Sequence, residues 1–258
     1  MTFLFDEIIF GPVKSRRLGV SLGINLLTVD RKVCNFDCIY CECGWTKNDQ
    51  KGEKLPSRKA VYEALEKKLL SMKEKGEAPD VITYAGNGEP TMHPEFAGII
   101  DDSIELRNRY FPSARVAVLS NATAIRKPAT REALLKADQN ILKLDSAIDE
   151  TISLHNQPKM AIKADELIDD LASFGGRLII QTLFLRGMYQ GRKVDNTTPA
   201  EIEAWLKAIE KIRPSEVMIY TISRDTPEGS ELEKISLSEL KHIASLVNKL
   251  GIKTQVSG

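Results

Sequence analysis

From residue 56 onward the chain alternates between short apolar segments and longer amphipathic ones, and this alternation is the strongest constraint on its fold. Apolar segments typical of buried strands lie at 81–85, 116–120, 141–145, 178–185, 217–222 and 252–256. Apolar residues recur at helical spacing in the segments between them, at 59–75, 94–110, 128–137 and 160–173. Strands that alternate with helices in this way indicate parallel β-α-β units with right-handed crossovers.

Capping residues mark where several of these helices begin. Thr198 and Glu201 form a capping box around a proline at the first helical position, and Ser236 and Glu239 form a second box. Ser57 stands where the N-cap of the first helix is expected. The sequence therefore predicts two further helices after Thr198 and Ser236.

An early strand near residues 22–27 brings the total to about six core strands, followed by the terminal one. Six strands are too few for a closed eight-stranded barrel. We therefore expect an α/β fold with a parallel sheet, a partial (β/α)6 TIM-like barrel with the cysteine loop after its first core strand. The alternative is a flat, doubly wound sheet. We expect one domain over residues 1–258, with 1–30 as an N-terminal extension and first strand and no auxiliary-cluster domain.

Charge and hydropathy narrow the classes of function. The 258 residues carry 36 Lys+Arg and 36 Asp+Glu, and this balance argues against general nucleic-acid binding while allowing a local basic patch. No apolar run approaches the roughly 20 residues that span a bilayer. The first residues lack a basic stretch followed by a sustained apolar one, which is the pattern of a signal peptide. We expect a cytoplasmic protein without membrane contact.

All four cysteines lie between positions 34 and 43, which indicates a metal centre in a reducing compartment rather than a disulfide framework. Cys34, Cys38 and Cys41 form a C-x3-C-x2-C motif. Three thiolates can bind three irons of a [4Fe–4S] cluster and leave the fourth iron open for chemistry. Zinc is the alternative, with Cys43 as a fourth sulfur, but Cys41 and Cys43 are awkwardly close for one tetrahedral ion. The three histidines are distant in sequence.

The motif, with the aromatic Tyr40 just before its third cysteine, resembles the signature of the radical S-adenosylmethionine (SAM) superfamily. Residues 11–25 together with the motif resemble a subgroup of small radical SAM proteins related to wybutosine-synthesis enzymes, and the resemblance covers nearly the whole chain. It implies a [4Fe–4S] cluster whose open iron is chelated by SAM. It also implies reductive cleavage of SAM to methionine and a 5′-deoxyadenosyl radical, which abstracts hydrogen from substrate. The electron would come from a flavodoxin- or ferredoxin-type donor, and Tyr40 would lie beside the cofactors.

A glycine-rich segment follows the strand at 81–85 and resembles the Gly-Gly-Glu motif of the superfamily. It consists of Gly86, Asn87, Gly88, Glu89 and Pro90. The resemblance implies that backbone carbonyls and the acidic side chain receive the methionine ammonium of SAM, and glycines allow such close approach. The segment departs from the motif by its asparagine, and an ordinary glycine turn is the alternative.

Polar residues at the ends of later strands are further candidates. Ser120 and Asn121 end the strand at 116–120, where ligands gather in parallel sheets, and suit the SAM ribose or carboxylate. Lys143 and Asp145 alternate with leucines, so both are expected to face the interior and to serve catalysis or SAM binding. A structural salt bridge is the alternative for this pair.

Weaker candidates for ligand contacts are polar residues that are expected to lie close to the site. Gln181 and Thr182 interrupt the apolar strand at 178–185 and could both face the ligand, and Arg224 could hold a carboxylate or phosphate. Arg16 and Arg17 precede the cysteine loop and could meet an anion. His93 is expected to serve a turn or packing, and the role of Cys43 is left open.

Three functions from different classes fit these residues. The first is a radical SAM oxidoreductase or transferase that modifies RNA or a nucleobase, as the subgroup resemblance implies. The second acts on a peptide or protein, including activation of a glycyl-radical enzyme. The third is a non-catalytic iron–sulfur or zinc protein, against which the segment 86–90 argues.

Overall fold

The computed structural model describes residues 3–46, 54–227 and 230–258 of the chain. It divides into two compact units, which we call the N-terminal and C-terminal units. The N-terminal unit comprises Leu4–Cys34 and Thr46–Ile141, and the C-terminal unit comprises Asn35–Trp45 and Leu142–Gly258, with Phe3. The cysteine motif is therefore shared between the units, because Cys34 ends one segment and the next residue begins the other.

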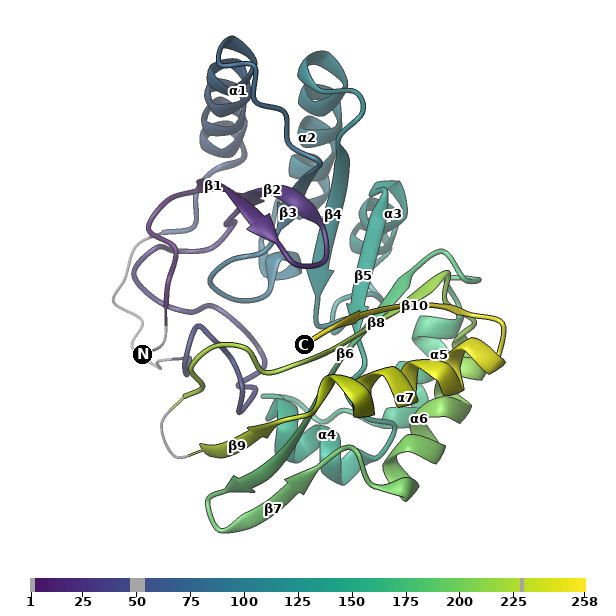
Figure 1. Ribbon diagram of the computed structural model, residues 1–258. Helices are drawn as coiled ribbons and strands as arrows, with labels where there is room; N and C mark the ends of the chain where they lie inside the picture. Colours follow the sequence, from purple (N-terminus) through teal and green to yellow (C-terminus); the bar gives the residue numbers. More distant parts are fainter. Residues whose placement is uncertain (1–2, 47–53, 228–229) are drawn as a thin grey trace. The chain divides into compact units, whose positions relative to one another are not determined.

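The N-terminal unit combines a parallel sheet with three helices (Figure 1). Its strands are β1 (Ile9–Ser15), β2 (Gly19–Ile24), β3 (Val81–Tyr84) and β4 (Arg115–Ser120). Its helices are α1 (Arg58–Glu74), α2 (Phe96–Tyr110) and α3 (Pro128–Lys136), and a 3-10 turn, η1, spans Pro90–Met92. Strand β1 pairs antiparallel with β2, whereas β2, β3 and β4 run parallel in that order. The helices pack against one another in chain order.

Local sequence explains why α1 forms where it does. The Ser57 hydroxyl accepts a hydrogen bond from the Ala60 amide at 3.2 Å, so the predicted N-cap is confirmed. The helix then buries one apolar stripe that recurs every three or four residues, namely Val61, Leu65, Leu69 and Met72. The stripe packs α1 onto the unit and leaves its charged face in solvent.

The C-terminal unit also combines parallel strands with helices, and its strand β6 is the longest of the described strands (Figure 1). The chain enters it through β5 (Gln139–Lys143), and its other strands are β6 (Ile179–Tyr189), β7 (Arg192–Asp195), β8 (Glu216–Thr221), β9 (Ser230–Lys234) and β10 (Lys253–Ser257). Its helices are α4 (Asp149–Asn156), α5 (Ala164–Ala172), α6 (Pro199–Ile212) and α7 (Leu237–Lys249). Strands β6, β8 and β10 run parallel, and β7 and β9 pair antiparallel with the last part of β6.

The predicted strands and helices are confirmed within a few residues. The six core strands are β2, β3, β4, β5, β6 and β8, with β10 as the terminal one. Thr198 and Ser236 cap α6 and α7 by accepting hydrogen bonds from Glu201 N and Glu239 N. The sequence analysis did not predict β1, β7, β9 or α4. A single domain over the whole chain stays a prediction. No helix of the described residues is long and apolar enough to cross a membrane.

Candidate functional site

The segment after β3 can be formed only by glycine at two positions. Gly86 and Gly88 have φ angles of 151° and 138°, in the region that side-chain-bearing residues rarely adopt. A Cβ atom on Gly88 would lie 1.9 Å from the backbone oxygen of Val33, and one on Gly86 would lie 2.6 Å from Oδ1 of Asn25. The glycines therefore let this segment run directly against the chain that precedes the cysteines.

Asn87 ties the same segment to the chain around it. Its side chain accepts a hydrogen bond from Phe5 N and donates to Phe5 O and Thr28 O, each at 2.8 Å, and the residue is fully buried. Both amide hydrogens are thereby used within the protein. The predicted role of the Asn87 side chain in cofactor binding stays untested, and what the geometry provides is a clamp that fixes the loop.

Glu89 accepts hydrogen bonds from Thr91, which follows β3, and from two residues at the end of β4. Its buried carboxylate accepts from Thr91 N (3.1 Å), Thr91 Oγ1 (2.5 Å), Ser120 Oγ (2.8 Å) and Asn121 N (2.6 Å). Burial raises the pKa of Glu89, and the four hydrogen bonds oppose that rise. The predicted candidates Glu89, Ser120 and Asn121 thus meet at the carboxyl ends of β3 and β4, and Pro90 begins η1 beside them.

Asn121 extends this cluster of polar groups to a cysteine. Its Oδ1 accepts from Thr123 N and Thr123 Oγ1, and its Nδ2 donates to Sγ of Cys34 at 3.8 Å. The side-chain amide is therefore oriented by a neighbour and aimed at a thiol. All of these contacts lie within the N-terminal unit.

In the C-terminal unit, the loop with the other motif cysteines is hydrogen-bonded to the C-terminal end of α4. The amide of Asp37 donates to the backbone oxygens of Asn156 (3.1 Å) and Gln157 (3.2 Å), and the amide of Ile39 donates to His155 O at 2.9 Å. An isolated antiparallel bridge joins Phe36 to Pro158. The last carbonyls of a helix have no partners inside it, so the cysteine loop satisfies them.

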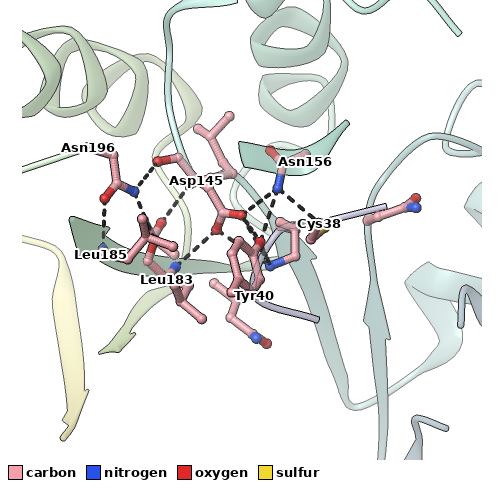
Figure 2. Close-up of polar contacts among 12 residues, drawn as sticks. Cys38, Tyr40, Asp145, Asn156, Leu183, Leu185 and Asn196 are labelled. Atoms are coloured by element: carbon pink, nitrogen blue, oxygen red, sulfur yellow. Dashed lines mark hydrogen bonds and ion pairs between the residues drawn. The ribbon is translucent and has the colours of Figure 1, made fainter. Parts of the chain in front are cut away.

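Four side chains form a polar network around Cys38 (Figure 2). The Tyr40 hydroxyl donates to Oδ2 of Asp145 and accepts from Lys143 Nζ at 2.9 Å. Lys143 Nζ also lies 3.3 Å from Oδ2 of Asp145. Asn156 Nδ2 donates to Asp145 Oδ2 (2.8 Å), to Tyr40 OH (3.0 Å) and to Sγ of Cys38 (3.5 Å). Lys143 and Asp145 thus form the salt bridge that was the alternative for this pair, and their role in catalysis or SAM binding stays a prediction.

Electrostatics in this network follow from burial and the nearby carboxylate. Burial, followed by the negative charge of Asp145, raises the pKa of Tyr40 well above its ordinary value. Burial lowers the pKa of Lys143, but Asp145 and then Tyr220 raise it to a value above the ordinary one. Tyr40 is accordingly neutral and Lys143 charged at neutral pH. The ion pair of this network is the one between Lys143 and Asp145.

The Asp145 backbone and carboxylate are anchored to β6 and β7. Leu183 N donates to Asp145 Oδ1 at 3.0 Å, and Asn196 Nδ2 donates to the backbone oxygens of Asp145 (2.9 Å) and Leu183 (2.8 Å). Asn196 Oδ1 accepts from Leu185 N at 2.9 Å. Asp145 lies beyond the end of β5, and these bonds replace the strand pairing that it lacks.

Two of the weaker candidates, Gln181 and Thr182, lie in different surroundings. Gln181 donates to Tyr220 OH at 2.6 Å, but Thr182 donates to Leu144 O and accepts from the indole of Trp205 in α6. The idea that Gln181 and Thr182 face the ligand together is wrong, because adjacent residues of a strand point to opposite faces.

Arg224 forms an ion pair with Glu42, next to Cys41, at 2.6 Å. His93 accepts from Glu95 N through Nδ1 and contacts Pro56 O through Nε2, which confirms its turn role. Roles of Arg16 and Arg17 in anion binding stay predictions.

The residues present fit an iron–sulfur cluster. The four cysteines are not joined in disulfide bonds, and both Cys34 and Cys38 accept a side-chain amide hydrogen bond at sulfur. Cluster sulfurs carry negative charge, and N–H donors stabilise them. Within residues 3–46, 54–227 and 230–258, no three His, Cys, Asp or Glu side chains are gathered as a metal site. The motif is divided between the units, with Cys34 in one and Cys38 and Cys41 in the other.

Sequence reasoning missed Asn156 and the role of Thr91. Thr91 follows the segment 86–90 directly, so a capping pattern with Glu89 as N-cap was available as a signal. Asn156 lies on a helix of eight residues that carries few apolar positions, and no local signal distinguishes it.

Curated relatives of the chain are found by sequence, whereas no family model matches it. The chain is 30% identical over 254 residues to UPF0026 protein MJ1312 of Methanocaldococcus jannaschii, covering 96% of this chain and 74% of that one. It is 28% identical over 237 residues to a UPF0026 protein of Helicobacter pylori J99, covering 90% and 71%. A protein named GTPase Obg of Brachyspira hyodysenteriae is 29% identical over 225 residues, and the chain spans only 30% of its length.

Solved structures share the fold at low sequence identity. A radical SAM methyltransferase from Sphaerobacter thermophilus matches with a TM-score of 0.67 and 12% identity, over 92% of this chain and 65% of that one. SuiB of Streptococcus suis, bound to precursor peptide SuiA, gives 0.64 and 14% over 92% and 48%. Archaeal TYW1 gives 0.52 and 13% over 89% and 71%. The chain has the fold of radical SAM enzymes, and the predicted partial TIM-like barrel is confirmed.

Proposed function

The chain belongs to the UPF0026 family, and we propose that it is a radical SAM enzyme that cleaves SAM reductively and abstracts hydrogen from a substrate. The observation that carries the proposal is the donor set of the cysteine motif on a radical SAM fold. Two of the three motif sulfurs already receive amide hydrogen bonds, which suits thiolates that hold a charged cluster.

Cys34, Cys38 and Cys41 would hold a [4Fe–4S] cluster through their sulfurs. When reduced, such a cluster supplies the electron that splits SAM into methionine and a 5′-deoxyadenosyl radical. The chain itself binds and orients SAM and keeps water from the site. The segment 86–90 and the end of β4 supply polar groups for this task, and both belong to the N-terminal unit.

Glu89 is suited to accept the methionine ammonium of SAM. A carboxylate has about four acceptor positions, two on each oxygen. Among the described residues, Oε1 of Glu89 takes three donors from Thr91 and Ser120, whereas Oε2 takes only the amide of Asn121. An ammonium group can therefore bind at Oε2 without displacing a protein donor.

In the C-terminal unit, Lys143 and Asp145 are proposed to bind SAM or substrate. The ammonium of Lys143 has three hydrogens, and it lies 2.9 Å from Tyr40 OH and 3.5 and 3.3 Å from the two oxygens of the Asp145 carboxylate. The two contacts with the carboxylate are longer than an ordinary hydrogen bond, so a ligand hydroxyl or carboxylate would compete with them for an N–H of Lys143. Tyr40, Gln181 and Arg224 are proposed as further ligand contacts in this unit.

For the substrate we propose RNA or a nucleobase, with a peptide or protein, including a glycyl-radical enzyme, as the second class. The proposal includes a flavodoxin- or ferredoxin-type electron donor and a cytoplasmic location. Incubation of the reduced protein with deuterium-labelled RNA or with labelled peptides distinguishes the two classes, because deuterium would enter 5′-deoxyadenosine only from the true substrate.

The cofactor is tested by anaerobic reconstitution with iron and sulfide. About four irons and four acid-labile sulfides per chain are expected. Alanine at Cys34, Cys38 or Cys41 should abolish cluster binding, whereas Cys43→Ala is the matched control and should retain it. Stoichiometric zinc without labile sulfide, or an equal loss in Cys43→Ala, would contradict the proposal.

A further inference from the structure

The side-chain amide of Asn156 is the group that joins Cys38 to the rest of the network (Figure 2). Asn156 is the last residue of α4 and is 2% exposed. Its Nδ2 lies 3.5 Å from Sγ of Cys38, 3.0 Å from Tyr40 OH and 2.8 Å from Oδ2 of Asp145. A primary amide has two hydrogens, so these acceptors together determine how the amide is turned.

The acceptors that orient Asn156 are themselves held in place. Asp145 accepts from Leu183 N at 3.0 Å and is paired with Lys143, which compensates its buried charge. The Tyr40 hydroxyl donates to Asp145 and accepts from Lys143, so it cannot rotate away without losing both contacts. The amide of Asn156 is therefore aimed at the sulfur by a fixed arrangement.

The sulfur is held by the same helix end as the amide. Backbone bonds from Asp37 and Ile39 to the last carbonyls of α4 attach the cysteine loop on both sides of Cys38. Because Asn156 occupies that helix end, the donor and the loop that carries the sulfur are attached to the same element.

We propose that Asn156 is a positioning residue whose amide hydrogen bond to Cys38 raises the reduction potential of the cluster, with Asp145 and Tyr40 orienting the amide. The inference rests on the proposed function. The step affected is one-electron reduction by a donor of the flavodoxin or ferredoxin class, with no proton transferred. Negative charge on the cysteine sulfurs grows on reduction, so an N–H donor stabilises the reduced state more than the oxidised one.

The test is a redox titration of the reconstituted protein, followed by the EPR signal of the reduced cluster. In Asn156→Leu the ratio of reduced to oxidised cluster at a fixed potential should fall about tenfold, which equals about 59 mV for one electron. Asn156→Gln keeps an amide donor and should recover part of the loss. Asn196→Leu is the matched control, because Asn196 is similarly buried but its side-chain hydrogen bonds run to backbone atoms of Asp145, Leu183 and Leu185.

An unchanged potential in Asn156→Leu, or an equal shift in Asn196→Leu, would overturn the inference. If Asn156→Leu does not retain iron, Asn156→Ala is measured in its place, since it lacks the donor and adds neither bulk nor charge, and a wild-type potential in that variant would also overturn the inference. Loss of iron in both variants with retention in Asn156→Gln supports the inference, and loss in all three overturns it. Absence of a cluster in the wild-type protein would instead reject the proposed function.

Discussion

Replacing Glu89 by glutamine tests the polar cluster at the ends of β3 and β4. Glutamine offers one oxygen for four donors, and its amide nitrogen must take the place of one carboxylate oxygen. The least costly orientation puts the nitrogen at Oε2, because the remaining oxygen then still accepts from Thr91 N, Thr91 Oγ1 and Ser120 Oγ, and among the described residues only Asn121 N loses its acceptor. That arrangement still leaves a buried backbone N–H facing an NH2 group.

An unsatisfied buried group costs about 1–3 kcal/mol. Part of this cost is offset, because the glutamine side chain is neutral whereas burial disfavours the charged carboxylate of Glu89. We expect Glu89→Gln to lower the unfolding free energy by about 1–2 kcal/mol, which in a chain of this size shifts Tm by about 2–8 °C. Thermal unfolding followed by circular dichroism measures the shift, and equilibrium dialysis with labelled SAM should show weaker binding.

Ser120→Ala provides the matched control, since it removes one of the four hydrogen bonds and keeps the charge. It should lose about 1 kcal/mol and retain SAM binding. The pH dependence supplies a second check. The pKa of Glu89 in the folded state is raised from 4.5, so just above pH 4.5 the folded protein binds more protons at this group than the unfolded protein does. The stability of the wild-type protein should therefore gain from Glu89 as the pH falls toward 4.5. Wild-type stability and SAM affinity in Glu89→Gln would refute the role assigned to the carboxylate.

Three further predictions concern other buried groups. Burial lowers the pKa of His155 to about 4 from 6.5, so the wild-type protein should lose about 3 kcal/mol of unfolding free energy as pH falls from 6.5 to 4, and His155→Phe should show a smaller slope in urea titrations. Gly88→Ala should cost about 1–3 kcal/mol or more through strain and a backbone clash, and Gly191→Ala, where the Cβ has open space, should cost less. Asp145→Asn and Lys143→Met should retain iron but slow SAM cleavage by roughly 10- to 150-fold, whereas normal cleavage with lower Tm would make the pair structural.

Much of the fold could be predicted because local and tertiary preferences agree. Capping at Ser57, Thr198 and Ser236 and apolar periodicity identified the long helices, and apolar runs identified the strands that lie inside the sheet. The elements that were missed lack such signals. Strand β7 has the sequence Arg-Lys-Val-Asp with one buried residue, and it is ordered by pairing with β6 rather than by its own composition.

The candidate site shows the same division. Glu89, Ser120 and Asn121 could be predicted to meet because parallel strands bring their carboxyl ends to one edge. Asn156 could not, since its function depends on a backbone attachment between α4 and the cysteine loop that no local pattern reveals. Thr182 was misplaced because strand alternation separates it from Gln181, a rule that the sequence analysis had applied correctly to Lys143 and Asp145.

Formation of 5′-deoxyadenosine tests the central claim most directly. The anaerobically reconstituted protein is reduced with dithionite, supplied with SAM and analysed by chromatography and mass spectrometry. The account predicts 5′-deoxyadenosine and methionine in equal amounts, formed slowly even without substrate and absent in Cys38→Ala. A fully iron-loaded, reduced protein that forms no 5′-deoxyadenosine and whose EPR spectrum does not respond to SAM would contradict the account.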